Sequence, residues 1–347
     1  MHRRLPVYLL IDCSESMIGE GITAVRSGLS QMLQVLRQDP HALETAWLSV
    51  ISFGAKAELL APLTEITELQ EPILRLGQGT ALGAAFDLLS KQILSEVRRS
   101  TNNSKGDYRP MVILLTDGQP TDDWEKAKQR FDKSITKILS NFYVVGCGQA
   151  IDYKFLSDIS DIVLSLPDMT PESMRKLFVW MTQTVSTASI GTNEVKDAIP
   201  GIDILPKEIV RFTPGQKGFP KEVMQVFLPG ICSHEEGRYL MRYVKNEDSG
   251  GAYHAKASYV LSSEEIDTGE VKPISAEQEQ VRLEGALACP YCRTYGWIQC
   301  GNCRIHYCMG TMEGKAITNN MKSTCPNCKE SLSLSESDSF GADFSRG

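Results

Sequence analysis

Continuous apolar runs alternate with helical patterns along the first half of the chain. Val7–Ile11 and Met111–Leu115 are unbroken apolar runs, which is typical of strands buried on both faces. In Gly21–Leu36, apolar residues recur at the spacing of an amphipathic helix. Such strands and helices alternate, which predicts an α/β fold with a doubly wound, mostly parallel, Rossmann-like sheet. The further predicted strands are Ala46–Phe53, Ala57–Ala61, Phe142–Cys147 and Ile162–Leu166, and the further helices are Ala81–Val97, Trp124–Leu139 and Pro171–Ser186.

Polar residues follow both central strands. Asp12, Ser14 and Ser16 come after the first strand, and Asp117 comes after the second. Right-handed crossovers predict that these two strands are neighbours, so Asp12 and Asp117 should face each other across one crevice. Oxygen ligands of this kind suit a hard cation such as Mg²⁺ or Mn²⁺. Asp and Ser after a strand are also ordinary turn and cap residues, so the first loop alone leaves both interpretations open.

A third motif favours the cation site. The stretch Gly77–Ala85 is rich in glycine and opens a helix with Thr80 near its start. Asp-x-Ser-x-Ser, this threonine and a strand ending Thr-Asp-Gly occur in order, and the set resembles the von Willebrand factor A domain over residues 5–188. The resemblance implies a metal-ion-dependent adhesion site. In it, Ser14, Ser16 and Thr80 offer hydroxyl oxygens directly to the cation, Asp12 and Asp117 act largely through water or hydroxyl hydrogen bonds, and Thr80 changes its engagement between states.

Three acidic residues near these motifs are expected to have secondary roles. Glu15 stands where many relatives carry glycine, and we expect it to alter only the rim of the site. Asp122 and Asp123 precede a predicted helix, so we interpret them as its cap and first-turn charges rather than as metal ligands.

The pattern changes after residue 188. Prolines interrupt the helical period, and Met224–Leu228, Arg238–Val244 and Ala255–Leu261 predict short strands. Cys232 and His234 in this region could be ligands, but we favour a turn cysteine and a surface histidine. The end of the chain is rich in Ser, Asp and Glu, which predicts disorder. We therefore expect a von Willebrand A domain over residues 1–188, a β-rich module and linker over 189–287, a zinc-binding domain over 288–330 and a disordered tail over 331–347.

Cysteines dominate the region from residue 289 to residue 328. Pairs with C-x-x-C spacing can converge on one ion, and tetrahedral thiolate and imidazole sets are preferred by zinc. The predicted ligands are Cys289, Cys292, Cys300, Cys303, His306, Cys308, Cys325 and Cys328, which suffice for two closed zinc sites. A single zinc held by Cys289, Cys292, Cys325 and Cys328 is the alternative. Closed sites are structural, so we expect this short segment to need the metal in order to fold.

The two ends of the chain together resemble the TerY family of bacterial tellurite-resistance proteins. The resemblance rests on the adhesion-site motifs and on the tail sequences CPYC, YGWIQC, CRIHYC and STCPNC. It implies a cytoplasmic stress-response component that works beside a protein kinase and a PP2C-type phosphatase.

Charge and motifs narrow the class of function. The net charge of −7 argues against general nucleic-acid binding, and the sequence shows neither a secretory signal nor a membrane-spanning stretch, so we expect a cytoplasmic protein. No hydrolase motif is present, and Ser14 has no neighbouring base. We expect a non-enzymatic, cation-dependent module that binds an acidic residue of a protein partner. The alternative is an accessory subunit of an AAA-type ATPase.

Overall fold

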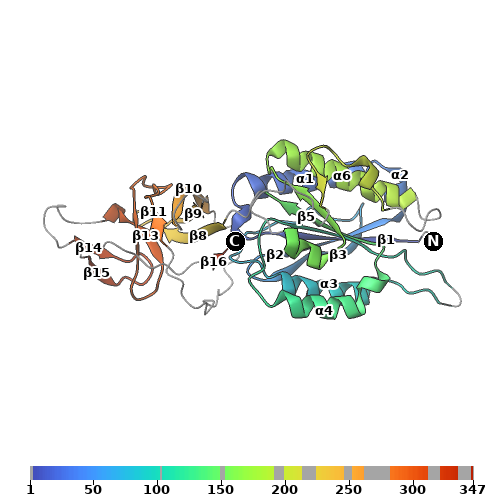
Figure 1. Cartoon of the computed structure of the whole chain (residues 1–347), viewed down its shortest axis with the longest axis horizontal. Coiled ribbons are helices and arrows are strands. Elements are labelled where there is room, and N and C mark those ends of the chain that lie inside the picture. Colours follow the sequence, from blue (N-terminus) through green and yellow to red (C-terminus); the bar gives the residue numbers. More distant parts are fainter. Residues whose placement is uncertain are drawn as a thin grey trace. The chain divides into compact units, whose positions relative to one another are not determined.

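The computed structural model describes residues 3–101, 104–148, 153–190, 199–212, 224–245, 252–261, 282–311, 321–334 and 345–346. The chain forms two compact units, Met1–Glu222 and Val223–Gly347. Both units are drawn in Figure 1, and each is considered by itself below.

The N-terminal unit is built on one twisted sheet. Its described strands are β1 (Leu5–Asp12), β2 (Ala46–Phe53), β3 (Ala57–Glu65), β4 (Met111–Thr116), β5 (Asn141–Cys147), β6 (Ile162–Leu166) and β7 (Val210–Arg211). They are arranged in the order β3-β2-β1-β4-β5-β6-β7. The edge strands β3 and β7 are antiparallel to their neighbours, and the other pairs are parallel. The predicted doubly wound, mostly parallel sheet is confirmed.

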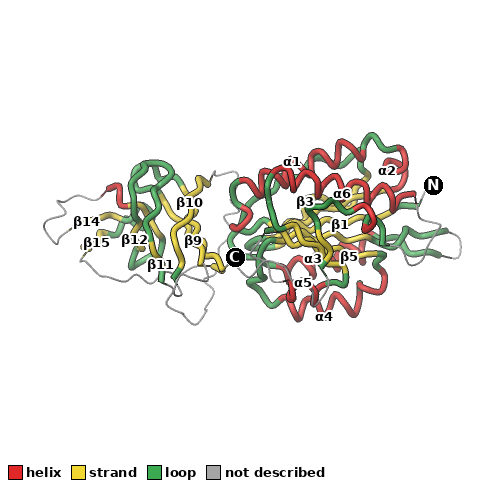
Figure 2. The backbone as a smooth tube through the Cα atoms, turned by 45° about the horizontal axis from the view of Figure 1, so that its top comes forward, coloured by secondary structure: helices red, strands yellow, loops and turns green. Residues whose placement is uncertain are grey.

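Helices cover both faces of this sheet, as Figures 1 and 2 show. The described helices are α1 (Glu20–Leu36), α2 (Pro40–Thr45), α3 (Leu82–Glu96), α4 (Trp124–Ser134), α5 (Tyr153–Ile159) and α6 (Pro171–Ile190), with short 3₁₀ turns η1 (Glu15–Met17), η2 (Thr136–Ile138) and η3 (Ile202–Ile204). Helices α1, α2 and α6 pack on one face, and α3, α4 and α5 pack on the other. The short α2 and α5 were not predicted, because neither is long enough to show a helical period.

Strand β1 explains the position of the first predicted site. Every residue of β1 is buried. Val7, Leu9 and Ile11 belong to the core beside α1 and α6, whereas Tyr8 and Leu10 belong to the core beside α3 and α4. Burial of both faces accounts for the unbroken apolar run. Since β1 lies between β2 and β4, the loop after Asp12 emerges at the centre of the sheet.

The C-terminal unit contains a second, antiparallel-rich sheet. Its elements are β8 (Met224–Ile231), β9 (Arg238–Lys245), β10 (Tyr253–Leu261), β11 (Leu283–Glu284), β12 (Trp297–Gln299), β13 (His306–Cys308), η4 (Met309–Thr311), β14 (Met321–Thr324), β15 (Ser331–Leu334) and β16 (Ser345–Arg346). Within the described residues, the strand order is β11-β10-β9-β8-β13-β12, β16 also pairs with β8, and β14 pairs with β15 separately. The three predicted strands in this region correspond to β8, β9 and β10.

The structure differs from the expected domain boundaries. The expected boundary at residue 188 precedes β7, which pairs with β6 of the first sheet. The boundary at residue 287 falls inside the second sheet, because β13 pairs with β8. The expected disorder over 331–347 does not hold for Ser331–Leu334, which forms β15, or for Ser345–Arg346, which forms β16; residues 335–344 and 347 lie outside the described chain. Among the described helices, none is long and apolar enough to cross a membrane.

Candidate metal centres

Three loops of the N-terminal unit bring the predicted oxygen ligands together. The parallel register of β1 and β4 pairs Ile11 with Leu115, so the loops after both strands leave the sheet side by side. Gly77 forms a bridge with Ser14 and donates its N–H to the carbonyl of Cys13 at 2.8 Å. This contact joins the loop that carries Thr80 to the loop after β1.

The side chains in these loops form one hydrogen-bonded group. The Ser16 hydroxyl donates to Asp117 Oδ1 at 2.6 Å, and the hydroxyl oxygens of Ser14 and Ser16 are 2.9 Å apart. Asp12 accepts hydrogen bonds on both carboxylate oxygens, from the Ser14 N–H at 2.9 Å and from the Thr116 hydroxyl at 2.6 Å. Asp12 is therefore oriented by its neighbours. Of the predicted ligands, Ser16 is partly exposed, while the others are buried.

Thr80 supplies an independent test of whether a cation fits. Its hydroxyl oxygen is buried and has no hydrogen-bond partner within the described chain, although its N–H donates to the Thr121 hydroxyl at 2.9 Å. A buried polar group left unsatisfied is unfavourable by about 1–3 kcal/mol. A hard cation would satisfy this oxygen, and the hydroxyl and carboxylate groups of the two adjoining loops are ligands that Mg²⁺ and Mn²⁺ accept. The residues present fit the implied ion.

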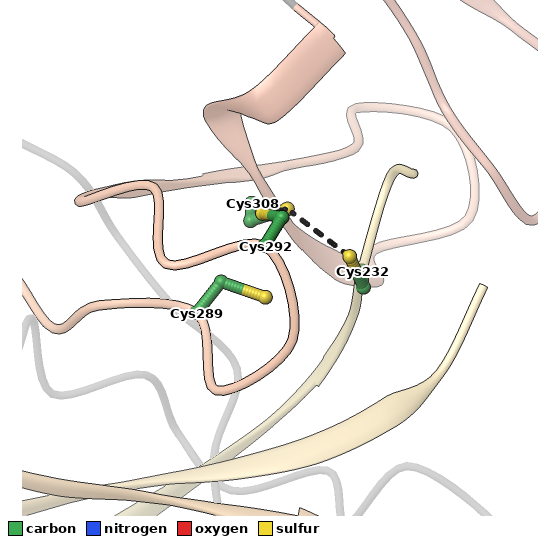
Figure 3. A group of neighbouring side chains, drawn as sticks. All are labelled: Cys232, Cys289, Cys292 and Cys308. Atoms are coloured by element: carbon green, nitrogen blue, oxygen red, sulfur yellow. Dashed lines mark hydrogen bonds between the residues drawn. The ribbon is translucent and has the colours of Figure 1, made fainter. Parts of the chain in front are cut away.

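The cysteines of the C-terminal unit form two groups of four within the described residues. One group comprises Cys232, Cys289, Cys292 and Cys308, and the other comprises Cys300, Cys303, Cys325 and Cys328; the sulfur atoms of each group lie within 4.8 Å of one another. Figure 3 shows the first group, whose side chains converge from the end of β8, from the loop before β12 and from β13. No cysteine of the described chain is in a disulfide.

The separations of the sulfur atoms suit a tetrahedral ion. Cys292 and Cys308 are 3.5 Å apart, and Cys308 and Cys232 are 3.9 Å apart. In the second group, Cys300 and Cys328 are 3.5 Å apart, and Cys303 and Cys325 are 3.6 Å apart. A regular zinc tetrahedron with Zn–S bonds of about 2.3 Å has edges of about 3.8 Å. These separations far exceed a disulfide bond of about 2.05 Å.

Four turns of one type hold seven of these eight cysteines, and the eighth, Cys308, lies on β13. In each turn, the first cysteine accepts at its carbonyl from the N–H four residues later, at 2.9–3.0 Å, and donates its own N–H to the carbonyl five residues later, at 2.8–2.9 Å. The residue four positions after the first cysteine has a left-handed backbone conformation. The turns begin at Cys232, Cys289, Cys300 and Cys325, and their left-handed residues are Glu236, Arg293, Arg304 and Lys329. Within the described chain, these four are the non-glycine residues with a positive φ.

The turn at Cys232 shows why the expected ligand set was incomplete. Three turns carry a second cysteine three residues after the first, whereas the turn at Cys232 carries Glu235 there. Cys308 provides the fourth sulfur instead. It is adjacent to Cys232 because Ile231 pairs with Tyr307 in the contact between β8 and β13. Our preference for Cys232 as an ordinary turn cysteine is corrected by this grouping, and no C-x-x-C spacing pointed to it.

His306 is the second correction to the predicted ligands. It lies on the same strand as Cys308, but its ring nitrogens belong to neither sulfur group. His306 is buried, its Nδ1 donates to the carbonyl of Pro229 at 3.1 Å, and its ring meets Trp297 edge-on with centroids 4.8 Å apart. The structure therefore gives His306 a packing position and places it in neither sulfur group. His234 is exposed and contacts the carbonyl of Gly310.

Thiol acidity within each group is uneven. At Cys292, burial is outweighed by hydrogen bonds from Thr294 and neighbouring thiols, which lower the pKa to about 6. Cys303 has a pKa lowered to about 6 for the same reason, with Ile305 and Asn327 among the partners. Burial raises the pKa of Cys289 and of Cys325. Each group thus contains one thiol that ionises readily, and the thiolate is the form that binds metal.

Comparison with known proteins decides the family of the N-terminal unit. The family model for the von Willebrand factor type A domain matches residues 7–170. This region is a von Willebrand factor type A domain. No curated protein sequence matches the chain.

Solved structures resemble the chain only weakly. Proximal thread matrix protein 1 from the mussel byssus is 16% identical with a TM-score of 0.40, and the match covers 52% of this chain and 48% of that one. The PilB minor pilin from Streptococcus sanguinis is 11% identical with a TM-score of 0.42, covering 56% and 64%. The ArnB paralog VWA2 from Sulfolobus acidocaldarius is 14% identical with a TM-score of 0.37, covering 77% and 67%. This chain therefore spans about half the length of the mussel protein, and similarity at this level says nothing about function.

Thr121, which the sequence did not single out, and Asp122, which it assigned to another helix, join the loops of the von Willebrand A domain. The Thr121 hydroxyl accepts from the N–H of Thr80, and the Thr121 N–H donates to the Thr80 carbonyl at 3.0 Å. Asp122 accepts from the N–H groups of Gly83 and Ala84 at 3.0 Å each, so it caps α3. Of the two residues considered as the cap of the following helix, Asp123 holds the N-cap position, without a side-chain cap bond, and Asp122 does not.

The two carboxyl groups of the predicted cation site, Asp12 and Asp117, have raised pKa values. Burial raises the pKa of Asp12, against the hydrogen bonds from Thr116 and Ser14. Burial raises the pKa of Asp117 well above its ordinary value, and the nearby Asp12 carboxylate adds to the rise. Without a cation, the folded state therefore holds protons on these groups more tightly than the unfolded chain does. Their contribution to stability is present below the unfolded pKa of 3.8 and is lost as pH rises through the raised folded pKa.

This linkage predicts how Mg²⁺ stabilises the von Willebrand A domain at different pH values. Since the cation binds the deprotonated carboxylates, its stabilising effect should be larger at about pH 7.5 than at about pH 5. At about 100 times its dissociation constant, Mg²⁺ should raise the free energy of unfolding by about 2.7 kcal/mol. Thermal unfolding with Mg²⁺ or EDTA measures this, and Asp12→Ala should remove the difference. An equal effect of Mg²⁺ at both pH values would contradict the assignment.

The sulfur groups predict a specific pattern of metal content. The intact chain should carry two zinc ions per molecule, because each group offers four thiolates. Cys232→Ser should lower the content to about one ion, since three sulfurs hold zinc less tightly than four. His306→Ala should keep both ions. Elemental analysis of the purified proteins measures the zinc content. If His306→Ala lost zinc while Cys232→Ser kept both ions, His306 would be a ligand and Cys232 would not, as the sequence had predicted.

Proposed function

We propose that the von Willebrand A domain is a divalent-cation-dependent module that binds a protein partner through a carboxylate. The observation that carries this proposal is the Thr80 hydroxyl, which is buried and has no hydrogen-bond partner within the described chain. The loop that carries it is joined to the loop of Ser14 and Ser16 through Gly77. A cation bound between these loops would supply the partner that the Thr80 hydroxyl lacks.

The chemistry of the donors explains how such a site could bind an acidic partner. Ser14, Ser16 and Thr80 are neutral ligands, while Asp12 and Asp117 already engage hydroxyl groups. A bound Mg²⁺ or Mn²⁺ would supply an electrophilic position that exchanges water for a carboxylate. The accessible side is at Ser16, because Asp12, Ser14 and Thr80 are buried. A partner side chain would approach there.

The cysteine groups support a structural role for the C-terminal unit. Four thiols in each group leave no open ligand position, and closed zinc sites stabilise a fold rather than catalyse a reaction. We therefore propose that the protein is not an enzyme. Its zinc-stabilised unit would hold the fold and could offer a second contact surface.

The biological setting is proposed from the motif resemblance described above. We infer a cytoplasmic component of a bacterial tellurite or general stress response, in the manner of the TerY family. Its partners would be a protein kinase and a PP2C-type phosphatase. Reduced thiols in all ten cysteines suit a reducing compartment. No observation favours the ATPase-accessory alternative.

Cation-dependent capture tests the proposed module. A partner held by the intact chain in Mg²⁺ should be released by EDTA, and Ser14→Ala should lose it while the fold survives, because Ser14 lies in a loop outside the sheet. Ser95→Ala, an exposed hydroxyl at the end of α3, is the matched control and should bind normally. Capture that is insensitive to both EDTA and Ser14→Ala would contradict the proposal.

The role of the partner carboxylate can be measured once a partner is in hand. Removing that carboxylate should weaken binding about as much as Thr80→Ala, since both act through one network around the ion. The two changes together should be little worse than either alone. Calorimetry on the four combinations measures the coupling, and fully additive losses would show that the carboxylate does not meet the metal.

A further inference from the structure

Glu15 lies between the two serines of the first loop, but it does not sit at the rim as expected. Its side chain is 3% exposed, and its Oε2 accepts the N–H of Gly79. Gly79 immediately precedes Thr80. The carboxylate therefore reaches from the loop after β1 to the backbone of the loop that carries the unpartnered hydroxyl.

The backbone of residues 77–80 is held by three hydrogen bonds. Gly77 donates to Cys13, Gly79 donates to Glu15, and Thr80 donates to Thr121. Among these three acceptors, only Glu15 is a carboxylate, and hydrogen bonds to charged groups are roughly twice as strong as neutral ones.

Gly79 itself cannot compensate for the loss of this contact. Its φ of +80° is a left-handed conformation, and a Cβ at this position would come within 2.9 Å of the Thr121 hydroxyl. Glycine can adopt this conformation without strain, but it can also adopt many other backbone conformations. An external hydrogen-bond acceptor is needed to select it.

We propose that Glu15 is a positioning residue of the cation site. Its carboxylate holds the Gly79 N–H and thereby keeps the Thr80 hydroxyl inside the site. This inference rests on the proposed function only in that the site binds a cation. A residue with no side chain at position 15 could not make this contact, so here the strength of cation binding depends on a side chain that is not a ligand.

Variants at position 15 separate length from charge. Glu15→Gln keeps an acceptor oxygen at the same reach, so it should hold Gly79 and bind Mn²⁺ within about threefold of the intact chain. Glu15→Ala removes the acceptor and should weaken Mn²⁺ binding by about tenfold or more. Glu15→Asp keeps the charge but is one methylene shorter, so it should resemble Glu15→Ala. Glu20→Ala removes the exposed carboxylate at the start of α1 and should change nothing.

Titration calorimetry with Mn²⁺ measures these affinities, and thermal unfolding confirms that each variant is folded. If Glu15→Ala fails to fold, Glu15→Asp provides the same comparison. Equal Mn²⁺ affinity in the intact chain, Glu15→Ala and Glu15→Asp would overturn the proposal.

A second measurement shows whether Glu15 acts through Thr80. In a Thr80→Ala background, Glu15→Ala should cause no further loss of Mn²⁺ affinity, because the hydroxyl that it positions is already gone. Full additivity would mean that Glu15 acts by another route, and the proposal would fail.

Hydrogen exchange separates this proposal from the function of the site. In metal-free protein, the amides of residues 77–80 should exchange faster in Glu15→Ala than in the intact chain, with Glu15→Gln close to the intact chain. If the intact chain bound no Mn²⁺, the proposed function would be wrong. The hydrogen-exchange rates of residues 77–80 would then show by themselves whether Glu15 holds the loop. Unchanged exchange in Glu15→Ala would reject the positioning role.

Discussion

The parallel pairing of β1 with β4 is the constraint on which the cation site depends. It joins two strands buried on both faces, and a shift by one residue would exchange the side chains that fill the two cores. The register fixes the two loops that carry Asp12 and Asp117 at one edge of the sheet. Burial raises the pKa of both carboxyl groups, and the nearby Asp12 adds to the rise at Asp117. A cation would compensate the two charges when both groups are deprotonated.

The C-terminal unit depends on a different constraint. Its buried clusters are small and include the sulfur atoms themselves, so the apolar core alone offers little stability. The first sulfur group also joins distant parts of the chain, since Cys232 follows β8 while the other three ligands come from Cys289 to Cys308. A metal there would connect the sheet to the cysteine-rich segment, whereas the second group joins only residues 300–328. The two ions would therefore differ in how much of the unit they hold.

The sequence predicted most where a local pattern has one structural meaning. The unbroken run in β1 is typical of a strand covered on both sides, and the ends of neighbouring parallel strands lie at one edge of the sheet. The predictions from the sequence were wrong or incomplete where a residue's partner lies far away in the sequence. Cys232 belongs to an incomplete turn whose missing thiol comes from β13, and His306 was assigned from spacing alone. Asp122 was assigned to the nearer helix, although its partners are the amides of α3. Glu15 could not be placed, because its acceptor role depends on a loop 64 residues away.

The central claim is that Ser14, Ser16 and Thr80 bind one cation directly. Anomalous diffraction from crystals soaked in MnCl₂ tests it without any partner protein. We expect one strong manganese peak in the von Willebrand A domain, within about 2.5 Å of all three hydroxyl oxygens. A peak elsewhere, or a Thr80 hydroxyl that donates to a protein acceptor with no metal beside it, would contradict the account.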